Sequence, residues 1–97
     1  MPELEFVARW PDGVVAVYYS PSLVVREYLD AGSEYAVADF VERTRSALRI
    51  GSERVRAKYG YACARAAATL AQIEAKASEF NELAGATVVV EPGAEDL

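Results

Sequence analysis

The sequence contains no histidine and a single cysteine, Cys63, and each shortage excludes several kinds of active site, metal site or cross-link. Without histidine there is no Ser-His-Asp or Cys-His triad, and the usual zinc and non-haem iron sites lose their commonest ligand. One cysteine allows no internal disulfide, which fits a reducing compartment, so we expect a cytoplasmic protein. No CxxC, HExxH, GxGxxG or GxxxxGKS/T motif occurs either. We therefore expect no metal and no other cofactor.

Long apolar runs are also missing. No stretch reaches membrane-spanning length, and the opening MPELEF has neither the basic region nor the apolar region of a secretory signal. The composition, 53% hydrophobic and 26% charged over 97 residues, is that of one globular domain. We expect this domain over residues 1–91 and an acidic flexible tail over residues 92–97.

The first part of the chain has the pattern of a β-hairpin over residues 3–20. Within residues 4–10, every second residue is apolar (Leu4, Phe6, Ala8 and Trp10) and Glu5, Val7 and Arg9 fall on the other side, which predicts a strand with one buried face. Pro11, Asp12 and Gly13 then supply the residues of a tight turn, and residues 14–19 form a second strand rich in valine and tyrosine. A short helix over residues 23–29 should follow, capped by Ser20 or Ser22 and stopped by Gly32.

From residue 39 the apolar spacing becomes helical and keeps its phase as far as Phe80. Because one helix of that length would far exceed so small a sheet, we predict a helical hairpin broken at Gly60, with a weaker kink at Gly51. The alanine-rich second helix should span residues 62–83, and the β-branched residues 87–90 should form a third strand.

The predicted fold class is α+β. A three-stranded sheet, made of the N-terminal β-hairpin plus the C-terminal strand, packs against the helical hairpin and one short helix. The apolar stripe from Phe40 to Phe80 is longer than one face of such a sheet covers, so we also expect a homodimer.

Four sequence blocks resemble one known family. They are RWPDG at residues 9–13, YSPSLVV at residues 19–25, DFVER at residues 39–43 and SERVRAKYG at residues 52–60. Together they resemble small bacterial nitrogen-starvation response proteins that are encoded beside a nitrilase-like hydrolase. The resemblance implies a setting and protein partners, among them enzymes of a nitrilase-containing gene cluster. Tyr18 stands where that family often has a cysteine, so chemistry that needs two thiols is missing here.

Positive charge is concentrated in residues 43–65. This basic segment holds seven of the ten basic residues and one of the fifteen acidic residues, Glu53, so it carries a formal charge of +6 while the rest carries −11. On a helical wheel Arg45, Arg49 and Arg56 fall on one side. If the helix continues past the glycines, Arg43, Arg54, Lys58 and Arg65 fall on another. The candidate binding residues are Arg45, Arg49, Arg54, Arg56, Lys58 and Arg65.

Two interpretations of the basic segment remain open. In the first, it is a solvated helix surface whose arginines pair with acids such as Glu42, Glu27 or Glu74. In the second, its guanidinium groups bind an acidic partner or an anionic ligand. Nucleic acid is the weakest candidate, because the whole chain has a net charge of −5.

Three function classes follow, in order of preference. The first is a non-catalytic accessory or regulatory protein of the nitrogen-starvation response that acts by protein-protein contacts. The second is a small-anion or nucleotide-binding module that uses the basic helix 43–65. The third is an enzyme that uses Cys63 or a tyrosine. We expect Cys63 to be a buried, slowly reacting thiol among alanines. The acid pairs Glu3/Glu5 and Glu79/Glu82 are interpreted as surface features.

Overall fold

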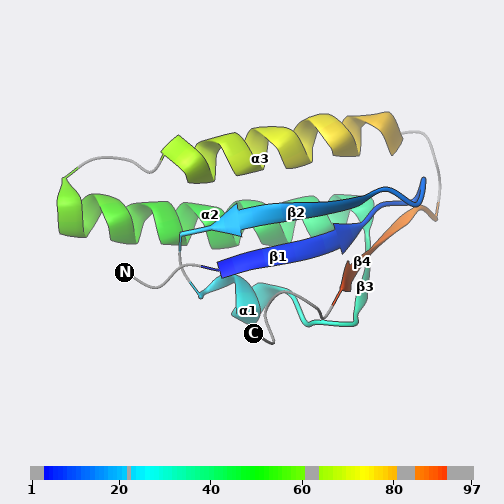
Figure 1. Ribbon diagram of the computed structural model, residues 1–97, viewed down its shortest axis with the longest axis horizontal. Helices are drawn as coiled ribbons and strands as arrows, with labels where there is room; N and C mark the ends of the chain where they lie inside the picture. The colour runs from blue at the N-terminus through cyan, green and yellow to red at the C-terminus, as the bar shows by residue number, and fades with distance from the viewer. Residues whose placement is uncertain (1–3, 22, 61–63, 81–84, 92–97) are drawn as a thin grey trace.

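The computed structural model describes residues 4–21, 23–60, 64–80 and 85–91. A sheet forms one layer, and two long helices cover one of its faces (Figure 1). The elements, in chain order, are β1 (Leu4–Arg9), β2 (Val15–Ser20), α1 (Val25–Tyr28), β3 (Glu34–Ala36), α2 (Val37–Tyr59), α3 (Ala64–Ala77) with a 3-10 turn (Ser78–Phe80), and β4 (Thr87–Glu91). The predicted tail over residues 92–97 lies outside the described residues.

The sheet has four antiparallel strands in the order β2-β1-β4-β3, one strand more than the three that we predicted. The extra strand, β3, is only three residues long, too short for a visible alternation. It becomes a strand through its pairing with β4, in which Tyr35 faces Val88. The Gly32 amide donates to the Val90 carbonyl at 2.6 Å, which extends the contact. The prediction that residues 87–90 share a sheet with the hairpin is confirmed.

The N-terminal hairpin agrees with its sequence pattern. Leu4, Phe6 and Ala8 are buried while Glu5 and Arg9 are exposed, so one face of β1 meets the helices. The chain reverses at Gly13, whose φ of +86° is readily adopted only by glycine and whose amide donates to the Trp10 carbonyl at 2.9 Å.

The helical hairpin breaks at Gly60, as predicted. Gly60 adopts φ +82°, and its amide donates to the Arg56 carbonyl at 2.7 Å, so it ends α2 at Tyr59. The predicted kink at Gly51 is wrong, because α2 runs without interruption through this buried glycine. The predicted ends of the second helix at residues 62 and 83, and Cys63 with them, lie outside the described residues.

The short helix differs from its prediction at both ends. It covers only Val25–Tyr28, and Val24 occupies the N-cap position without a side-chain capping bond. Ser20 therefore does not cap it but is the last residue of β2, whereas Ser22 lies outside the described residues. Gly32 does not end the helix at Tyr28; its φ of +84° turns the chain toward β3.

The core lies between the sheet and the helices. Trp10, Phe40, Ile73 and Val88 are almost fully buried there. Leu48 and Phe80 join the same cluster, so most of the apolar stripe that we expected to need a second chain is covered within this one. The chain reversal at Gly60 explains this, because it folds the two halves of the stripe onto one sheet. The stripe therefore gives no reason to expect a dimer.

We expect alkaline pH to destabilise the wild-type protein more than a Tyr18→Phe variant. Tyr18 is buried, and its hydroxyl accepts a hydrogen bond from Trp10 Nε1 at 2.9 Å. Burial raises the Tyr18 pKa above its usual 10.0, and the bond from Trp10 offsets only part of this rise. The resulting stability is complete below pH 10 and is lost as the pH rises through the folded-state pKa. Urea midpoints measured between about pH 8 and 11 should fall less for Tyr18→Phe; parallel curves would contradict this.

Candidate functional site

Arg43, the first arginine of the basic segment, connects three elements of the fold. Arg43 Nε donates to Asp39 at 2.9 Å, and its Nη1 donates to the Tyr28 carbonyl at 2.9 Å. Its guanidinium also lies 4.7 Å from the centre of the Tyr35 ring. The hydrogen bond to Asp39 raises the Arg43 pKa further above its already high value. One side chain thus ties α1 and β3 to α2, a structural role.

Arg45 links the two long helices. It donates to Glu42 on its own helix and to Glu74 on α3, the second bond at 2.8 Å. The bond to Glu74 is the main cause of its raised pKa, and Glu42 adds to it. The prediction that Glu42 and Glu74 pair with arginines of the basic segment is therefore confirmed. Arg45 is already neutralised, which makes it a poor anchor for an outside anion.

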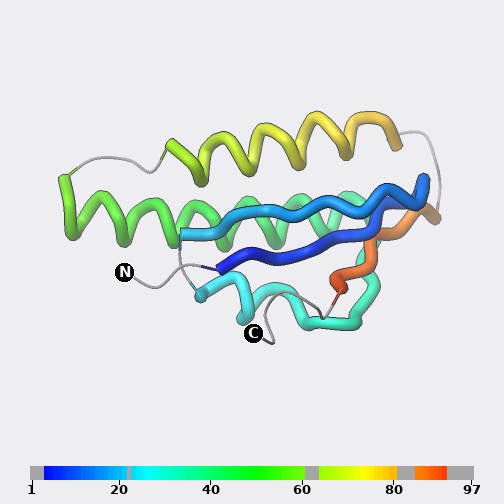
Figure 2. The backbone as a smooth tube through the Cα atoms, viewed as in Figure 1, coloured from blue at the N-terminus to red at the C-terminus, as the bar shows by residue number. Residues whose placement is uncertain are grey.

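Arg49 and Arg56 differ from Arg45, although all three lie on the same side of α2. Both are exposed and stand two helical turns apart. Within the described parts of the chain, no carboxylate oxygen lies within 4.0 Å of either guanidinium. The C-terminal part of α2, whose last turn includes Arg56, extends beyond β1 and β2 (Figure 2).

The remaining candidates face elsewhere. Arg54 and Lys58 are exposed, and they lie about 140–180° around α2 from Arg49 and Arg56. Arg65 belongs to α3, where its guanidinium lies 3.7 Å from the centre of the Tyr19 ring on β2. The predicted wheel position of Arg65 beside Arg54 and Lys58 assumed one continuous helix. That grouping is wrong, because α2 ends before Gly60.

A hollow of about 300 Å³ lies beside Arg49, between α2 and α3. Its polar residues all come from α2 and its apolar residues come from both helices; the lining is Arg45, Leu48, Arg49, Ser52, Glu53, Ala66, Ala67 and Leu70. Ala66 and Ala67 have short side chains, so this side of α3 leaves space for the hollow. The sequence indicated the arginines but not the residues of α3, whose only signal was the run of alanines.

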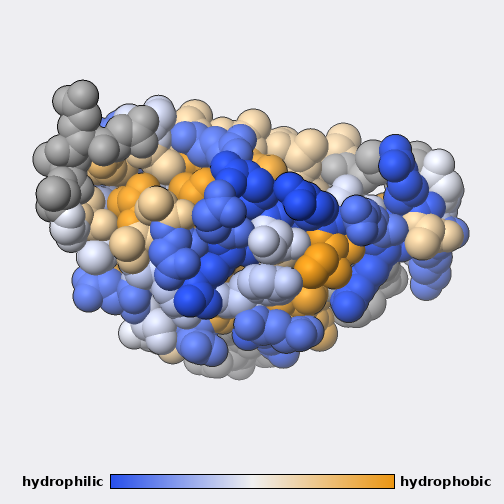
Figure 3. Space-filling model, turned by 180° about the vertical axis from the view of Figure 1, so that it is seen from behind, coloured by the Kyte–Doolittle hydropathy of each residue, from blue (hydrophilic) through white to orange (hydrophobic). Residues whose placement is uncertain are grey.

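A second hollow of about 540 Å³ lies at the other end of the helical hairpin. It is lined by residues of α2, α3 and the segment before β4, including Val37, Val41 and Phe80. Arg45 and Glu74 border it as well, so their ion pair stands between the two hollows. From behind, a band of hydrophilic side chains crosses this side of the molecule between more hydrophobic areas (Figure 3).

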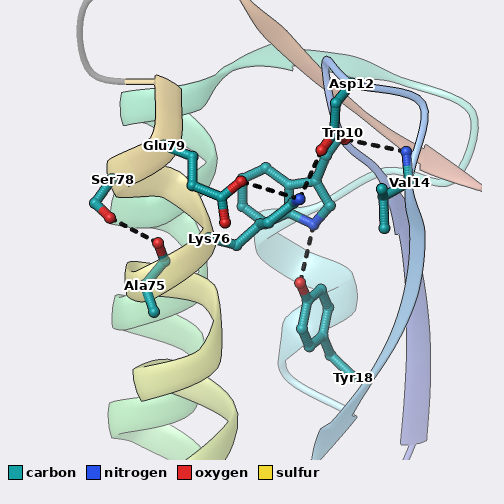
Figure 4. Close-up of polar contacts among 8 residues, drawn as sticks. All are labelled: Trp10, Asp12, Val14, Tyr18, Ala75, Lys76, Ser78 and Glu79. Atoms are coloured by element: carbon teal, nitrogen blue, oxygen red, sulfur yellow. Dashed lines mark hydrogen bonds and ion pairs between the residues drawn. The ribbon is translucent and has the colours of Figure 1, made fainter.

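Lys76 fastens α3 to the hairpin turn (Figure 4). Its ammonium group donates to Asp12 at 2.7 Å and to Glu79 at 3.4 Å, and it lies 5.5 Å from the centre of the Phe80 ring. The bond from Lys76 is the largest cause of a lowered pKa at Asp12, and the same bond raises the pKa of Lys76. This cluster explains why Lys76, the last basic residue, contributes to the fold and not to the candidate site.

The described residues contain no group of three or more cysteine, aspartate or glutamate side chains that could hold a metal ion. In the same part of the chain, no helix is both long enough and apolar enough to cross a membrane. The helical side carries two exposed guanidinium groups, those of Arg49 and Arg56, and Arg49 also lines the hollow between α2 and α3. Such a surface suits a partner that carries both carboxylates and apolar side chains.

Comparison with known proteins gives the family. The model of the nitrogen starvation-induced protein NitG matches residues 5–92. The chain belongs to the NitG family. No curated protein and no solved structure matches it. Membership connects the chain with nitrogen starvation. The matched range includes every described helix and strand except the first residue of β1. All of the candidate residues on α2 and α3 lie inside the matched range.

Proposed function

We propose that this NitG-family chain is a non-catalytic accessory protein of the nitrogen-starvation response, which binds an acidic segment of another protein at the hollow between α2 and α3. The observation that supports this most is the contrast within one helix face. Arg45 is neutralised by Glu42 and Glu74, whereas Arg49 and Arg56 are exposed and have no carboxylate oxygen of the described residues within 4.0 Å. Partners belong among the proteins produced in the same response, including enzymes of a nitrilase-containing gene cluster.

The chemistry of the hollow defines what the partner segment must present. Ala67, which is exposed, and Leu70, which is half-buried, offer apolar contact area, and the two guanidinium groups can each take a carboxylate through two parallel hydrogen bonds. An amphipathic helix with acidic residues beside its apolar stripe satisfies both requirements, because helices dock in apolar grooves through residues spaced three and four apart. The net charge of −5 on the whole chain makes a uniformly acidic partner unsuitable, so the acidic residues should be local.

A small anion is the second candidate, since a hollow of about 300 Å³ is the size of a small-molecule site and Arg49 lines it. Arg56, however, is absent from the lining, so a small ligand in the hollow would engage one of the two arginines. A macromolecular partner would engage both. The dependence of binding on Arg56 therefore distinguishes the two candidates.

Reversing the charge of both arginines should weaken binding of the partner by about five- to thirtyfold, since two lost charge pairs of about 0.5–1 kcal/mol each give that range. The partner is first captured from nitrogen-starved cells with the wild-type protein, identified by mass spectrometry and purified. Its affinity for Arg49→Glu/Arg56→Glu is then measured by titration calorimetry at low and moderate salt. The wild-type affinity should fall as salt rises, because exposed charges are screened.

The matched control is Arg54→Glu/Lys58→Glu, which makes the same change of charge on the same helix but on its other side. Its affinity should stay within about twofold of wild type, because long-range charge effects alone are small at moderate salt. Equal losses in both variants would mean that only the overall field of the segment matters. Unchanged binding by Arg49→Glu/Arg56→Glu would show that the basic segment is a solvated helix surface.

A further inference from the structure

Glu53 interrupts the positive charge of α2 where the partner segment is proposed to bind. It follows Arg49 by four residues and precedes Arg56 by three, so the three side chains fall within about 60° of one another around the helix axis. All three are exposed, and we call them the charged stripe. Along the helix the order of charges is positive, negative, positive, at intervals of about 6 Å and 4.5 Å.

The members of the charged stripe do not pair with one another. Arginine and glutamate three or four residues apart on a helix are close enough to form an ion pair. In the part of the chain that the structure describes, however, no basic nitrogen lies within 4.0 Å of the Glu53 carboxylate, and no carboxylate oxygen lies that close to Arg49 or Arg56. The stripe therefore presents three separate charges to its surroundings.

The hollow between α2 and α3 brings Glu53 into the proposed contact area. Glu53 lines this hollow together with Arg49, whereas the lining residues on α3 are uncharged: Ala66, Ala67 and Leu70. The charges at the hollow therefore all come from α2. A segment that covers the hollow removes water from Glu53, and a carboxylate that loses water is destabilised unless it gains a cation or hydrogen-bond donors.

We propose that the partner segment carries a basic residue opposite Glu53, between two acidic residues that meet Arg49 and Arg56. This charge order refines the function proposed above and rests on it. A partner helix that lies along α2 has the same rise per residue, so the residues that face the two arginines are seven apart. The basic residue then follows the first acidic residue by four positions if the helices run parallel, and by three if they run antiparallel.

Glu53 makes the site reject wrong partners as well as recognise the right one. A segment with an acidic residue at the middle position would bring two carboxylates together, and like charges that face each other across an interface are unfavourable. A polyanion such as nucleic acid brings a negative group to every position, so Glu53 opposes its binding too. The single acidic residue of the basic segment is therefore the residue that determines specificity.

Four synthetic helical peptides test the order of charges on the wild-type chain. They share one apolar stripe and differ at three positions, spaced four and then three residues apart: Glu-Lys-Glu, Glu-Gln-Glu, Glu-Glu-Glu and Lys-Glu-Lys. A second set, spaced three and then four, represents the antiparallel orientation. In one of the two sets, fluorescence anisotropy should show Glu-Lys-Glu binding about two- to fivefold more tightly than Glu-Gln-Glu, the effect of one exposed ion pair. Glu-Glu-Glu should bind more weakly than Glu-Gln-Glu.

The protein variant Glu53→Lys should reverse the preference at the middle position, so that Glu-Glu-Glu becomes its tightest peptide. Glu53→Gln should bind Glu-Lys-Glu and Glu-Gln-Glu with equal affinity. The control for net charge is Glu5→Lys, which makes the same change on the face of β1 turned away from the helices and should keep the wild-type ranking. Because Glu53 is exposed, its variants should unfold at about the wild-type urea midpoint.

The peptides separate failure of the charge order from failure of the proposed function. If the wild type binds all three acid-flanked peptides equally and Lys-Glu-Lys more weakly, the arginines bind acidic residues as proposed but Glu53 does not select a basic one. The same conclusion follows if Glu5→Lys changes the ranking as much as Glu53→Lys does. If no peptide binds, or if Lys-Glu-Lys binds as tightly as the others, both proposals are wrong.

Discussion

Alanine at position 10 is expected to lower the free energy of unfolding by about 3–5 kcal/mol, a large share of the roughly 5–15 kcal/mol that stabilises a domain of this size. Trp10 is 2% exposed and lies at the junction of the hairpin and both helices. Its ring stacks on Phe80, with centroids 6.0 Å apart, and meets the edge of Phe40 at 5.5 Å. The substitution would remove both aromatic contacts and leave a cavity where three elements meet.

Trp10→Phe separates the contribution of packing from that of the indole N–H. Phenylalanine retains an aromatic ring against Phe40 and Phe80 but leaves the Tyr18 hydroxyl without the donor that reaches it at 2.9 Å. We expect it to lose about half as much stability as Trp10→Ala, because ring contacts remain while one hydrogen bond of about 1 kcal/mol is lost. Chemical denaturation followed by far-UV circular dichroism measures both variants. Equal losses would show that ring packing contributes little.

Much of the fold was predictable because its signals are local. The alternation of residues 4–10, the turn at Gly13 and the helix stop at Gly60 each depend on a few neighbouring residues, and all three are present in the structure. The strand β3 was not predictable in this way. Its three residues have no pattern of their own and become a strand only because Val88 and its neighbours on β4 pair with them.

The candidate site shows the same limit. Local charge counting found the basic segment, and the helical wheel placed Arg49 and Arg56 together correctly. It could not show that Arg45 is neutralised across the helical hairpin by Glu74, twenty-nine residues further along the chain. Nor could it place Arg65, because a wheel assumes one axis and the chain reverses at Gly60. Contacts between distant residues, not the composition of the segment, decide which arginines remain available.

The helical hairpin carries the proposed site, so its own stability determines whether the site exists. Ile73 is the fully buried side chain that holds α3 against the core, and it lies between the buried residues Thr69 and Ala77 on the same helix face. An isolated helix of fourteen residues is marginal in water, so α3 depends on this packing. Ile73→Ala should cost about 2–5 kcal/mol, whereas Ile73→Val, which removes one methylene group, should cost about 0.5–1.5 kcal/mol.

The unfolding of Ile73→Ala also shows whether α3 and the sheet lose their stability together or separately. Trp10 contacts Phe80, the last residue of the 3-10 turn that follows α3, so tryptophan fluorescence reports on the end of the helical hairpin while far-UV circular dichroism reports on all helices. If α3 and the sheet form one cooperative unit, both signals should shift together to the same lower denaturant midpoint in Ile73→Ala. Separate transitions would mean that α3 detaches before the sheet unfolds. In that case the hollow between α2 and α3 would open and close in the folded protein, and Ile73→Ala should weaken partner binding while the sheet remains intact.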